Sequence, residues 1–208
     1  MSAEIPELTN FFRRQNFLRR FEKGHLICSQ EEQFDYVFMI HSGMVKMYDI
    51  DRNGDERTIA IFAGRSIFPL VWLLRDAPKE HLYYYEAYSD AICYVARQEE
   101  VRFFTRAHPH VLLGVADALA KAYINLAARV TNLERSHVRE RMEFVLYMLA
   151  TRLGTFEGTV AEISAIVTQE DISRMAGVTR ESVSLEMNHA KERELMWKHG
   201  HSTFIDIS

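Results

Sequence analysis

The chain has 208 residues, of which 48% are hydrophobic and 26% are charged, and its formal net charge is −4. This balance is ordinary for a globular protein and excludes a disordered one. The negative charge argues against a protein that coats nucleic acid non-specifically. No apolar run approaches the roughly 20 residues that a membrane span needs, and the first residues lack the order of a signal peptide. We therefore expect a cytoplasmic protein with no membrane partner.

The sequence contains no pattern typical of a metal site or of a catalytic site. The two cysteines, Cys28 and Cys93, do not have the spacing of a metal-ligand pair, so we expect buried free thiols and no metal site. An iron–sulfur cluster would require more cysteines than the chain has. The carboxylates show no paired arrangement, and no serine or cysteine lies in a nucleophile motif. We expect no catalytic residues and no enzymatic activity.

The first hundred residues predict a short helix followed by a β domain. Aromatic and arginine residues mix in the first twenty positions, which favours an amphipathic helix. Runs rich in Val, Ile, Tyr and Phe then follow at 25–28, 36–40, 44–50, 57–62 and 86–95. Turn signals separate them, the strongest being the hairpin dipeptide Asn53-Gly54. Short strands at this spacing predict a β barrel or sandwich over residues 1–108.

After Pro109 the hydrophobic period changes to that of a long helix. A 3–4 alternation of apolar residues predicts a narrow stripe on a helix within 109–136, which is typical of a dimeric coiled coil. Arg129 occupies the next expected position and interrupts it. A helix packed on its own β domain is the alternative reading. The predicted dimer interface comprises Leu112, Val115, Leu119, Ala122, Leu126 and Leu133.

Residues 137–208 predict a second, largely helical domain. Ser136 can cap a helix that Gly154 ends. The stretch QEDISRMAGVTRESV at 169–183 then has the pattern of a helix–turn–helix, with apolar and small residues placed for a tight crossing at Gly177. A strand–turn–strand pattern around His199-Gly200 predicts a small wing.

The outward face of the second helix of this motif carries side chains that can read bases. Arg180 can pair with guanine, Glu181 can accept from cytosine and Leu185 can touch a thymine methyl group. Residues 138–208 contain eight Lys/Arg and eleven Asp/Glu, so a few placed residues must account for binding, rather than bulk positive charge. The predicted exposed face is Thr179, Arg180, Glu181, Ser184, Leu185 and Asn188.

The order of β-roll, long helix and winged helix–turn–helix resembles the cyclic-AMP receptor/FNR (Crp/Fnr) family of bacterial transcription regulators. The β-roll spacing from Gly24 to Ala63-Gly64 is similar, and the run 179–184 (TRESVS) looks like the start of the family's recognition helix. The resemblance implies an α+β fold with a cyclic-nucleotide-binding-like jelly roll (1–108), a dimerisation helix (109–136) and a winged helix–turn–helix domain (137–208). It implies a homodimeric, sequence-specific regulator that binds a palindromic site in double-stranded DNA, with RNA polymerase as a further partner.

By the same resemblance, Arg180 and Glu181 read bases, Gln169 and Thr179 hold phosphates, and His199 lies in the wing. One departure concerns specificity. The family usually has a second arginine where this chain has Leu185, which removes a guanine contact worth roughly 1–3 kcal/mol. The main alternative function is a β-roll regulatory protein whose winged domain contacts another protein.

The resemblance also bears on the effector, which the sequence leaves unknown. Where the cyclic-nucleotide branch carries Gly-Glu, this chain has Pro69-Leu70, and no arginine lies around His81 to hold a phosphate, since Arg75 falls in the wrong place. We expect neither cyclic AMP nor haem, for which only the isolated candidates His25, His41 and His81 exist. Two readings stay open, a pocket for an apolar or aromatic ligand and core packing without an effector. Both concern the residues Phe68, Leu70, Trp72, Tyr83 and Tyr85.

Overall fold

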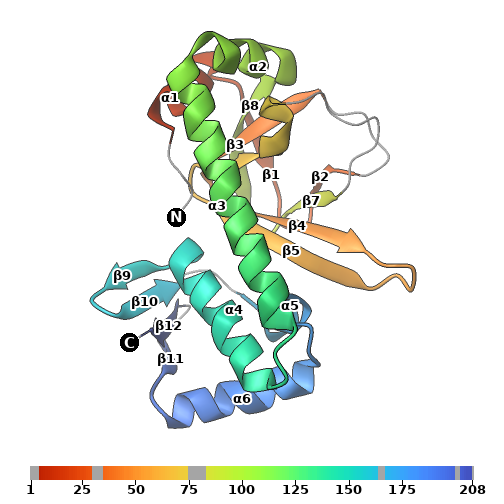
Figure 1. Cartoon of the computed structure of the whole chain (residues 1–208), viewed down its shortest axis with the longest axis vertical. Coiled ribbons are helices and arrows are strands. Elements are labelled where there is room, and N and C mark those ends of the chain that lie inside the picture. Colours follow the sequence, from red (N-terminus) through yellow and green to blue (C-terminus); the bar gives the residue numbers. More distant parts are fainter. Residues whose placement is uncertain (1–4, 30–34, 75–82, 164–166, 200–201, 208) are drawn as a thin grey trace. The chain divides into compact units, whose positions relative to one another are not determined.

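The computed structural model describes residues 5–29, 35–74, 83–163, 167–199 and 202–207 (Figure 1). It divides into two compact units, Ser2–Asn125 and Leu126–Ser208. The dividing point falls inside the long helix, rather than at either of its ends as the sequence division 1–108, 109–136 and 137–208 expects. Each unit has its own core and is described separately.

Two four-stranded sheets form the β-roll of the N-terminal unit, which confirms the predicted fold class. All the strand pairs within the two sheets are antiparallel. The first sheet has the order β1 (Leu18–Phe21), β8 (Ala91–Arg97), β3 (Tyr36–Ser42) and β6 (Ile67–Phe68). The second has the order β2 (Leu26–Cys28), β7 (Tyr84–Ala87), β4 (Met44–Ile50) and β5 (Glu56–Ala63).

Strand β3 explains why the run YVFMI is continuously apolar instead of alternating. Phe38 and Ile40 point into the core between the two sheets. Val37 and Met39 point to the opposite face, into a second core built with helices. All four are at most 1% exposed. A strand buried on both faces needs no polar positions.

Helices α1 (Pro6–Gln15) and α2 (Gln98–Ala107) supply the other side of that second core. Leu8 and Phe12 of α1 and Val101 of α2 are fully buried there. The prediction of one helix over the first twenty residues is wrong in its extent, because Asn16 adopts a left-handed conformation and β1 begins at Leu18. A short 3-10 helix, η1, spans Leu70–Leu73.

Helix α3 spans Pro109–Leu133, which confirms the predicted long helix. Its first half packs on the N-terminal unit, where Val111 and Val115 are fully buried in the core under α1 and α2. This corrects the assignment of Val115 to a dimer interface. Leu119 is half-buried against the same core, while Leu112, Ala122, Leu126 and Leu133 are exposed.

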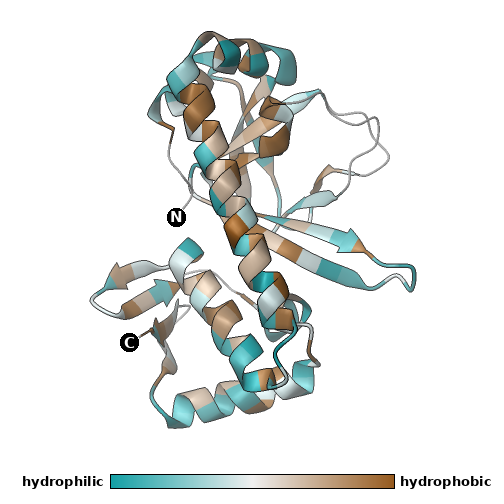
Figure 2. Ribbon diagram, in the orientation of Figure 1, coloured by the Kyte–Doolittle hydropathy of each residue, from teal (hydrophilic) through white to brown (hydrophobic). Residues whose placement is uncertain are grey.

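A second set of exposed apolar residues on α3 lies about one residue further round the helix than the predicted interface. Leu113 and Tyr123 are 71% and 72% exposed, and the spacing of the set alternates between three and four. We call this set the α3 stripe, and it comprises Leu113, Ala116, Ala120, Tyr123, Ala127 and Val130. The sequence alone could not separate it from the inward face, because apolar residues lie on both. Hydrophobic residues recur along the length of α3 (Figure 2).

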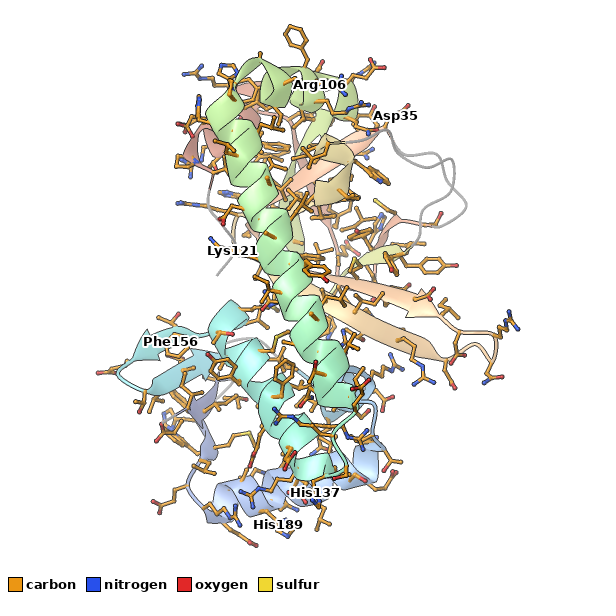
Figure 3. The ribbon with its side chains drawn as sticks, in the orientation of Figure 1. Asp35, Arg106, Lys121, His137, Phe156 and His189 are labelled. Carbon is orange, nitrogen blue, oxygen red and sulfur yellow. The ribbon has the colours of Figure 1, made fainter. Side chains whose placement is uncertain are left out.

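By length and composition alone, α3 would also suffice to cross a membrane, with a mean hydropathy of 1.5 over an 18-residue window. This corrects the expectation that no run is long enough, and the reason is the many alanines between the leucines. The helix nevertheless has a polar stripe at Asp117, Lys121, Asn125 and Arg129, each four residues from the last. Lys121, which is labelled in Figure 3, forms an ion pair of 2.6 Å with Asp117. A spanning helix would have to bury these groups in lipid at a cost of several kcal/mol.

The C-terminal unit packs three helices against a small sheet. Helix α4 spans Val138–Leu153, and its N-cap is His137, so the predicted cap at Ser136 is wrong. The sheet has the order β11 (Met196–His199), β12 (Ser202–Asp206), β10 (Val160–Ile163) and β9 (Thr155–Glu157). Gly154 ends α4 as predicted, but in an extended conformation. A Cβ there would lie 2.4 Å from the carbonyl oxygen of Ala150.

Candidate nucleic-acid interface

Helix α5 (Gln169–Ala176) begins with a reciprocal cap. The Thr168 hydroxyl accepts a hydrogen bond from the backbone N–H of Asp171 at 3.1 Å, and the Asp171 carboxylate accepts from the backbone N–H of Thr168 at 3.0 Å. Two of the N–H groups that a helix start leaves without partners are therefore satisfied. Gln169, a predicted phosphate contact, is the first helical residue and is half-buried.

The turn after α5 requires glycine. Gly177 has φ 63° and ψ 41°, a left-handed conformation that L-residues with a side chain disfavour. A Cβ at this position would also lie 3.2 Å from a methyl group of Leu133. The backbone N–H of Val178 closes the turn by donating to the Ser173 carbonyl at 3.1 Å. The single glycine of the motif thus fixes how the chain leaves the first helix.

Helix α6 (Arg180–Glu192) begins two residues after this turn, with Thr179 as its N-cap. The Thr179 hydroxyl accepts from the backbone N–H of Ser182 at 3.2 Å. Val183 and Met187 are 0% and 5% exposed and form the inward stripe that the sequence predicts, and α6 contacts both α4 and α5. This packing leaves the opposite face of α6 open.

The predicted base-reading residues lie together on that open face. Arg180, Glu181, Leu185 and Asn188 are exposed, and Ser184 is half-buried. Leu185 is 57% exposed, although burying an isobutyl group would stabilise the unit. Hydrogen bonds from its own backbone N–H and from the Thr179 hydroxyl lower the pKa of Glu181, so its carboxylate is ionised at neutral pH. The face therefore presents a cation, an anion, an amide and an apolar group side by side.

Two arginines hold the end of α5, and the sequence reading did not identify either role. Arg129 donates from Nη2 to the Met175 carbonyl at 3.4 Å, and Arg141 donates from Nη1 to the Gly177 carbonyl at 3.2 Å. Cations are favourable at this end of a helix because its last carbonyls have no partners within the helix. The interruption of the apolar pattern at Arg129 was the signal available in the sequence. That side chain is directed to the helix–turn–helix instead of to a partner helix.

The wing is the β11–β12 hairpin, in which Trp197 and Phe204 stack with their ring centroids 5.5 Å apart. His199 is exposed at the end of β11. Its predicted neighbour in the turn, Gly200, lies outside the described residues.

Glu186 of α6 is half-buried, and its carboxylate lies 3.6 Å from Nδ1 of His189. It therefore belongs to the side of α6 between the open and inward faces.

Aromatic rings stack on one another in the core between the two sheets of the β-roll. Phe68 stacks on Phe38 and Tyr85 with centroid distances of 5.2 and 5.3 Å, and Phe62 stacks on Phe68 at 6.1 Å. Phe68 is 1% and Tyr85 7% exposed, and burial raises the pKa of the Tyr85 hydroxyl. These rings form part of the core between the two sheets.

The five candidate effector residues do not meet at one place. Phe68, Tyr83 and Tyr85 belong to or pack on the core between the sheets, whereas Leu70 packs on the core under the helices. Trp72 is 3% exposed, and its carbonyl accepts from Gln98 of α2 at 3.2 Å. Of the two readings left open by the sequence, this distribution favours core packing over a single pocket built from the five.

Comparisons with known proteins agree with both halves of this description. The cyclic nucleotide-binding domain family matches residues 18–108. The HTH-type transcriptional regulator ArcR of Staphylococcus haemolyticus is 24% identical over 194 residues, which cover 93% of this chain and 84% of that protein. The CRP-like cAMP-activated global transcriptional regulator of Mycobacterium tuberculosis is 23% identical over 188 residues, covering 90% and 83% of the two chains. Over almost its whole length, the chain is similar to transcription regulators of the Crp/Fnr type.

The fold of the chain is also that of FixK2 from Bradyrhizobium japonicum, with a TM-score of 0.78 over 92% of each chain and 18% identity. At such identities the fold is shared while individual contact residues are free to differ. Positions such as Leu185 and Pro69-Leu70 therefore have to be judged from their own surroundings. Two positions used in the sequence reading of the effector site, Arg75 and His81, lie outside the described residues.

The other histidines proposed as haem ligands lie at the surface of the N-terminal unit. His25 and His41 are exposed, and each lies beside an aromatic ring, Phe21 and Tyr94 respectively, at a centroid distance of 5.4 Å. Among the described residues, no group of three or more His, Cys, Asp or Glu could hold a metal ion. Cys28 and Cys93 are free and buried, and burial raises the pKa of the Cys93 thiol to about 12.

Proposed function

We propose that this protein is a Crp/Fnr-type transcription regulator that binds a palindromic DNA site as a homodimer, with α6 in the major groove and no catalytic activity. The observation that carries the proposal is the open face of α6, where Arg180, Glu181, Leu185 and Asn188 are exposed above a helix fixed by Val183 and Met187. Arg180 pairs with guanine, Glu181 accepts from cytosine N4 and Leu185 touches a thymine methyl group. Gln169, Thr179 and His199 contact the sugar–phosphate backbone, and Ser184 and Asn188 add polar contacts along the helix.

The α3 stripe supports the homodimer. Its large side chains expose apolar surface that a monomer gains nothing by displaying, and its 3–4 spacing is that of a two-stranded coiled coil. Two-fold symmetry then presents two copies of α6 to half-sites about one helical turn apart, roughly 34–36 Å. RNA polymerase is a further proposed partner, and the cytoplasm is the proposed location.

The filled β-roll supports regulation without cyclic AMP. A cyclic nucleotide needs space for a base and ribose together with a cation for its phosphate, and the described interior offers stacked rings instead. We propose that Phe68, Tyr83, Tyr85, Leu70 and Trp72 act as packing residues. The effector, if the protein uses one, enters elsewhere.

The test begins with selection of binding sites from a random pool of DNA duplexes, because the operator is unknown. Affinity for the selected site is then measured for the wild type, Arg180→Ala and the control Arg52→Ala, an exposed arginine on the β4–β5 turn. Loss of a bidentate guanine contact should weaken binding by about 1–3 kcal/mol and relax the base preference at one position of each half-site. The control should leave affinity unchanged. An unaltered affinity of Arg180→Ala would refute the assignment of α6.

The net negative charge of residues 138–208 favours a second candidate, in which the winged unit contacts a protein. Salt dependence separates the two functions. DNA binding that neutralises several phosphates gives a steep negative slope of log affinity against log salt. Failure to enrich any duplex, with the protein shown to be folded, would favour the second candidate.

A further inference from the structure

The strongest local concentration of net charge in the chain belongs to the N-terminal unit and not to the helix–turn–helix. Residues 13–23 carry five cationic side chains and one carboxylate, in a chain whose net charge is −4. Within this stretch, every residue from Arg13 to Arg20 is exposed, including two apolar ones: Phe17 is 55% and Leu18 44% exposed. We call the following set the β1 patch: Arg13, Arg14, Phe17, Leu18, Arg19 and Arg20.

The arginines of the β1 patch have no partner within the part of the chain that the structure describes. Among the described residues, none of the four lies in an ion pair or side-chain hydrogen bond. Arg13 and Arg14 close the last turn of α1, and Arg19 and Arg20 follow in β1 after the left-handed residue Asn16. Four guanidinium groups within eight residues repel one another, so the free protein gains nothing from their proximity.

The backbone of β1 is also open on one side. Strand β1 is the last strand of its sheet and pairs only with β8 among the described strands. The backbone N–H of Val95 donates to the Phe17 carbonyl at 2.9 Å, and hydrogen-bonded pairs alternate along an antiparallel ladder. The N–H and carbonyl groups of Leu18 and Arg20 therefore point away from β8, toward the free edge.

We infer that the β1 patch binds an extended, acidic and apolar segment of another protein, which adds to the free edge of β1 as a further strand. Carboxylates of the segment pair with the arginines, its apolar side chains cover Phe17 and Leu18, and its backbone completes the ladder. A DNA duplex or an anionic membrane would satisfy the arginines alone. Only a polypeptide also satisfies the backbone groups of the edge.

Protection against aggregation is the simplest other explanation of charge on an edge strand. It accounts for Arg19 and Arg20, since charged side chains discourage pairing with other strands. It does not account for the exposed Phe17 and Leu18, which promote association, or for Arg13 and Arg14, which lie on a helix. The combination of apolar, cationic and unpaired backbone groups fits recognition better than avoidance.

The test uses the full-length protein and a fluorescein-labelled peptide that alternates acidic and apolar residues, Asp-Phe-Glu-Ile-Asp-Leu-Glu, with binding followed by fluorescence anisotropy. The double variant Arg19→Glu/Arg20→Glu should bind at least about ten-fold more weakly, and Phe17→Ser should also bind more weakly, because charge and apolar contacts are both lost. The control Arg52→Glu, which reverses an exposed arginine of the same unit, should stay within about two-fold of the wild type.

A second arm keeps the protein unchanged. The same peptide with N-methyl groups on alternate backbone nitrogens retains its charge but cannot pair as a strand, so it should bind at least about ten-fold more weakly. Equal binding of both peptides would overturn strand addition. The inference also fails if the peptide does not bind. It fails as well if the double variant binds the peptide as the wild type does and is weakened only in binding to an unrelated DNA duplex or to phosphatidylserine vesicles. None of these results bears on α6, so the inference stands or falls independently of the proposed function.

Discussion

Replacement of Gly177 by alanine should destabilise the C-terminal unit through two separable effects. The first is conformational, because a residue with a Cβ at φ 63° pays roughly 1–2 kcal/mol relative to glycine. The second is steric, because the new Cβ would lie 3.2 Å from the Leu133 methyl group, tighter than ordinary contact. That methyl group can move by a few tenths of an ångström to relieve the contact. We therefore assign the steric effect a cost of about 0.5–1 kcal/mol, which is below the cost of overpacking a rigid core. The expected total is about 1.5–3 kcal/mol.

Gly158, in the β9–β10 turn, provides a matched control. It also has φ 63°, but a Cβ there would have no atom within 4 Å. Gly158→Ala should therefore show the conformational cost alone, about 1–2 kcal/mol. Urea unfolding followed by circular dichroism gives the free energy of unfolding of each variant, and hydrogen exchange of the α5 and α6 amides assigns the change to the C-terminal unit. Two variants of equal stability would refute the steric part. A Gly177→Ala variant as stable as the wild type would refute the whole account of the turn.

Three further substitutions test other parts of the structure. Thr179→Ala should cost about 1 kcal/mol in urea unfolding because it removes the cap of α6, while Thr179→Ser should retain most of it. Leu113→Glu should convert the dimer to a monomer in light scattering, because it places a charge in the α3 stripe, whereas Lys121→Glu on the polar stripe should not. A dimer that survives Leu113→Glu would place the interface elsewhere. Phe68→Ala should cost about 3–5 kcal/mol if this ring is core, and a loss below about 1 kcal/mol would reopen the pocket reading.

The elements with a clear period could be predicted from sequence. The β3 and β4 runs, the span of α3 and the helix–turn–helix all follow local patterns, and the turn at Gly177 follows from the absence of a Cβ. Strand β1 was missed because its residues are mostly exposed at a sheet edge, so they carry no hydrophobic alternation. The sequence could not separate the inward face of α3 from its exposed face, because apolar residues on both faces satisfy the same spacing. Only the packing of Val111 and Val115 on their own unit decides between them.

Some features of the candidate site could likewise be predicted from sequence, and others could not. The open face of α6 could be read from the positions of Val183 and Met187, since burial of one face exposes the other. The sequence could not decide between a pocket and core packing, because apolar residues that are close in sequence, such as Phe68 and Leu70, belong to different cores. The roles of Arg129 and Arg141 depend on carbonyls far along the chain, and no local pattern announces a contact across 46 or 36 residues.

Helix α3 belongs to both units without a linker between them. Val111 and Val115 anchor one end in the first core, and Arg129 and Asn132 tie the other end to α5 and α4. An insertion or deletion of one residue between these anchors would change their phase about the helix axis by about 100° and their separation by about 1.5 Å. If both sets of anchoring contacts are kept during evolution, the number of residues in α3 can therefore change only by amounts close to whole helical turns. Lengths that differ by one or two residues should be far rarer among functional relatives than substitutions along the same helix.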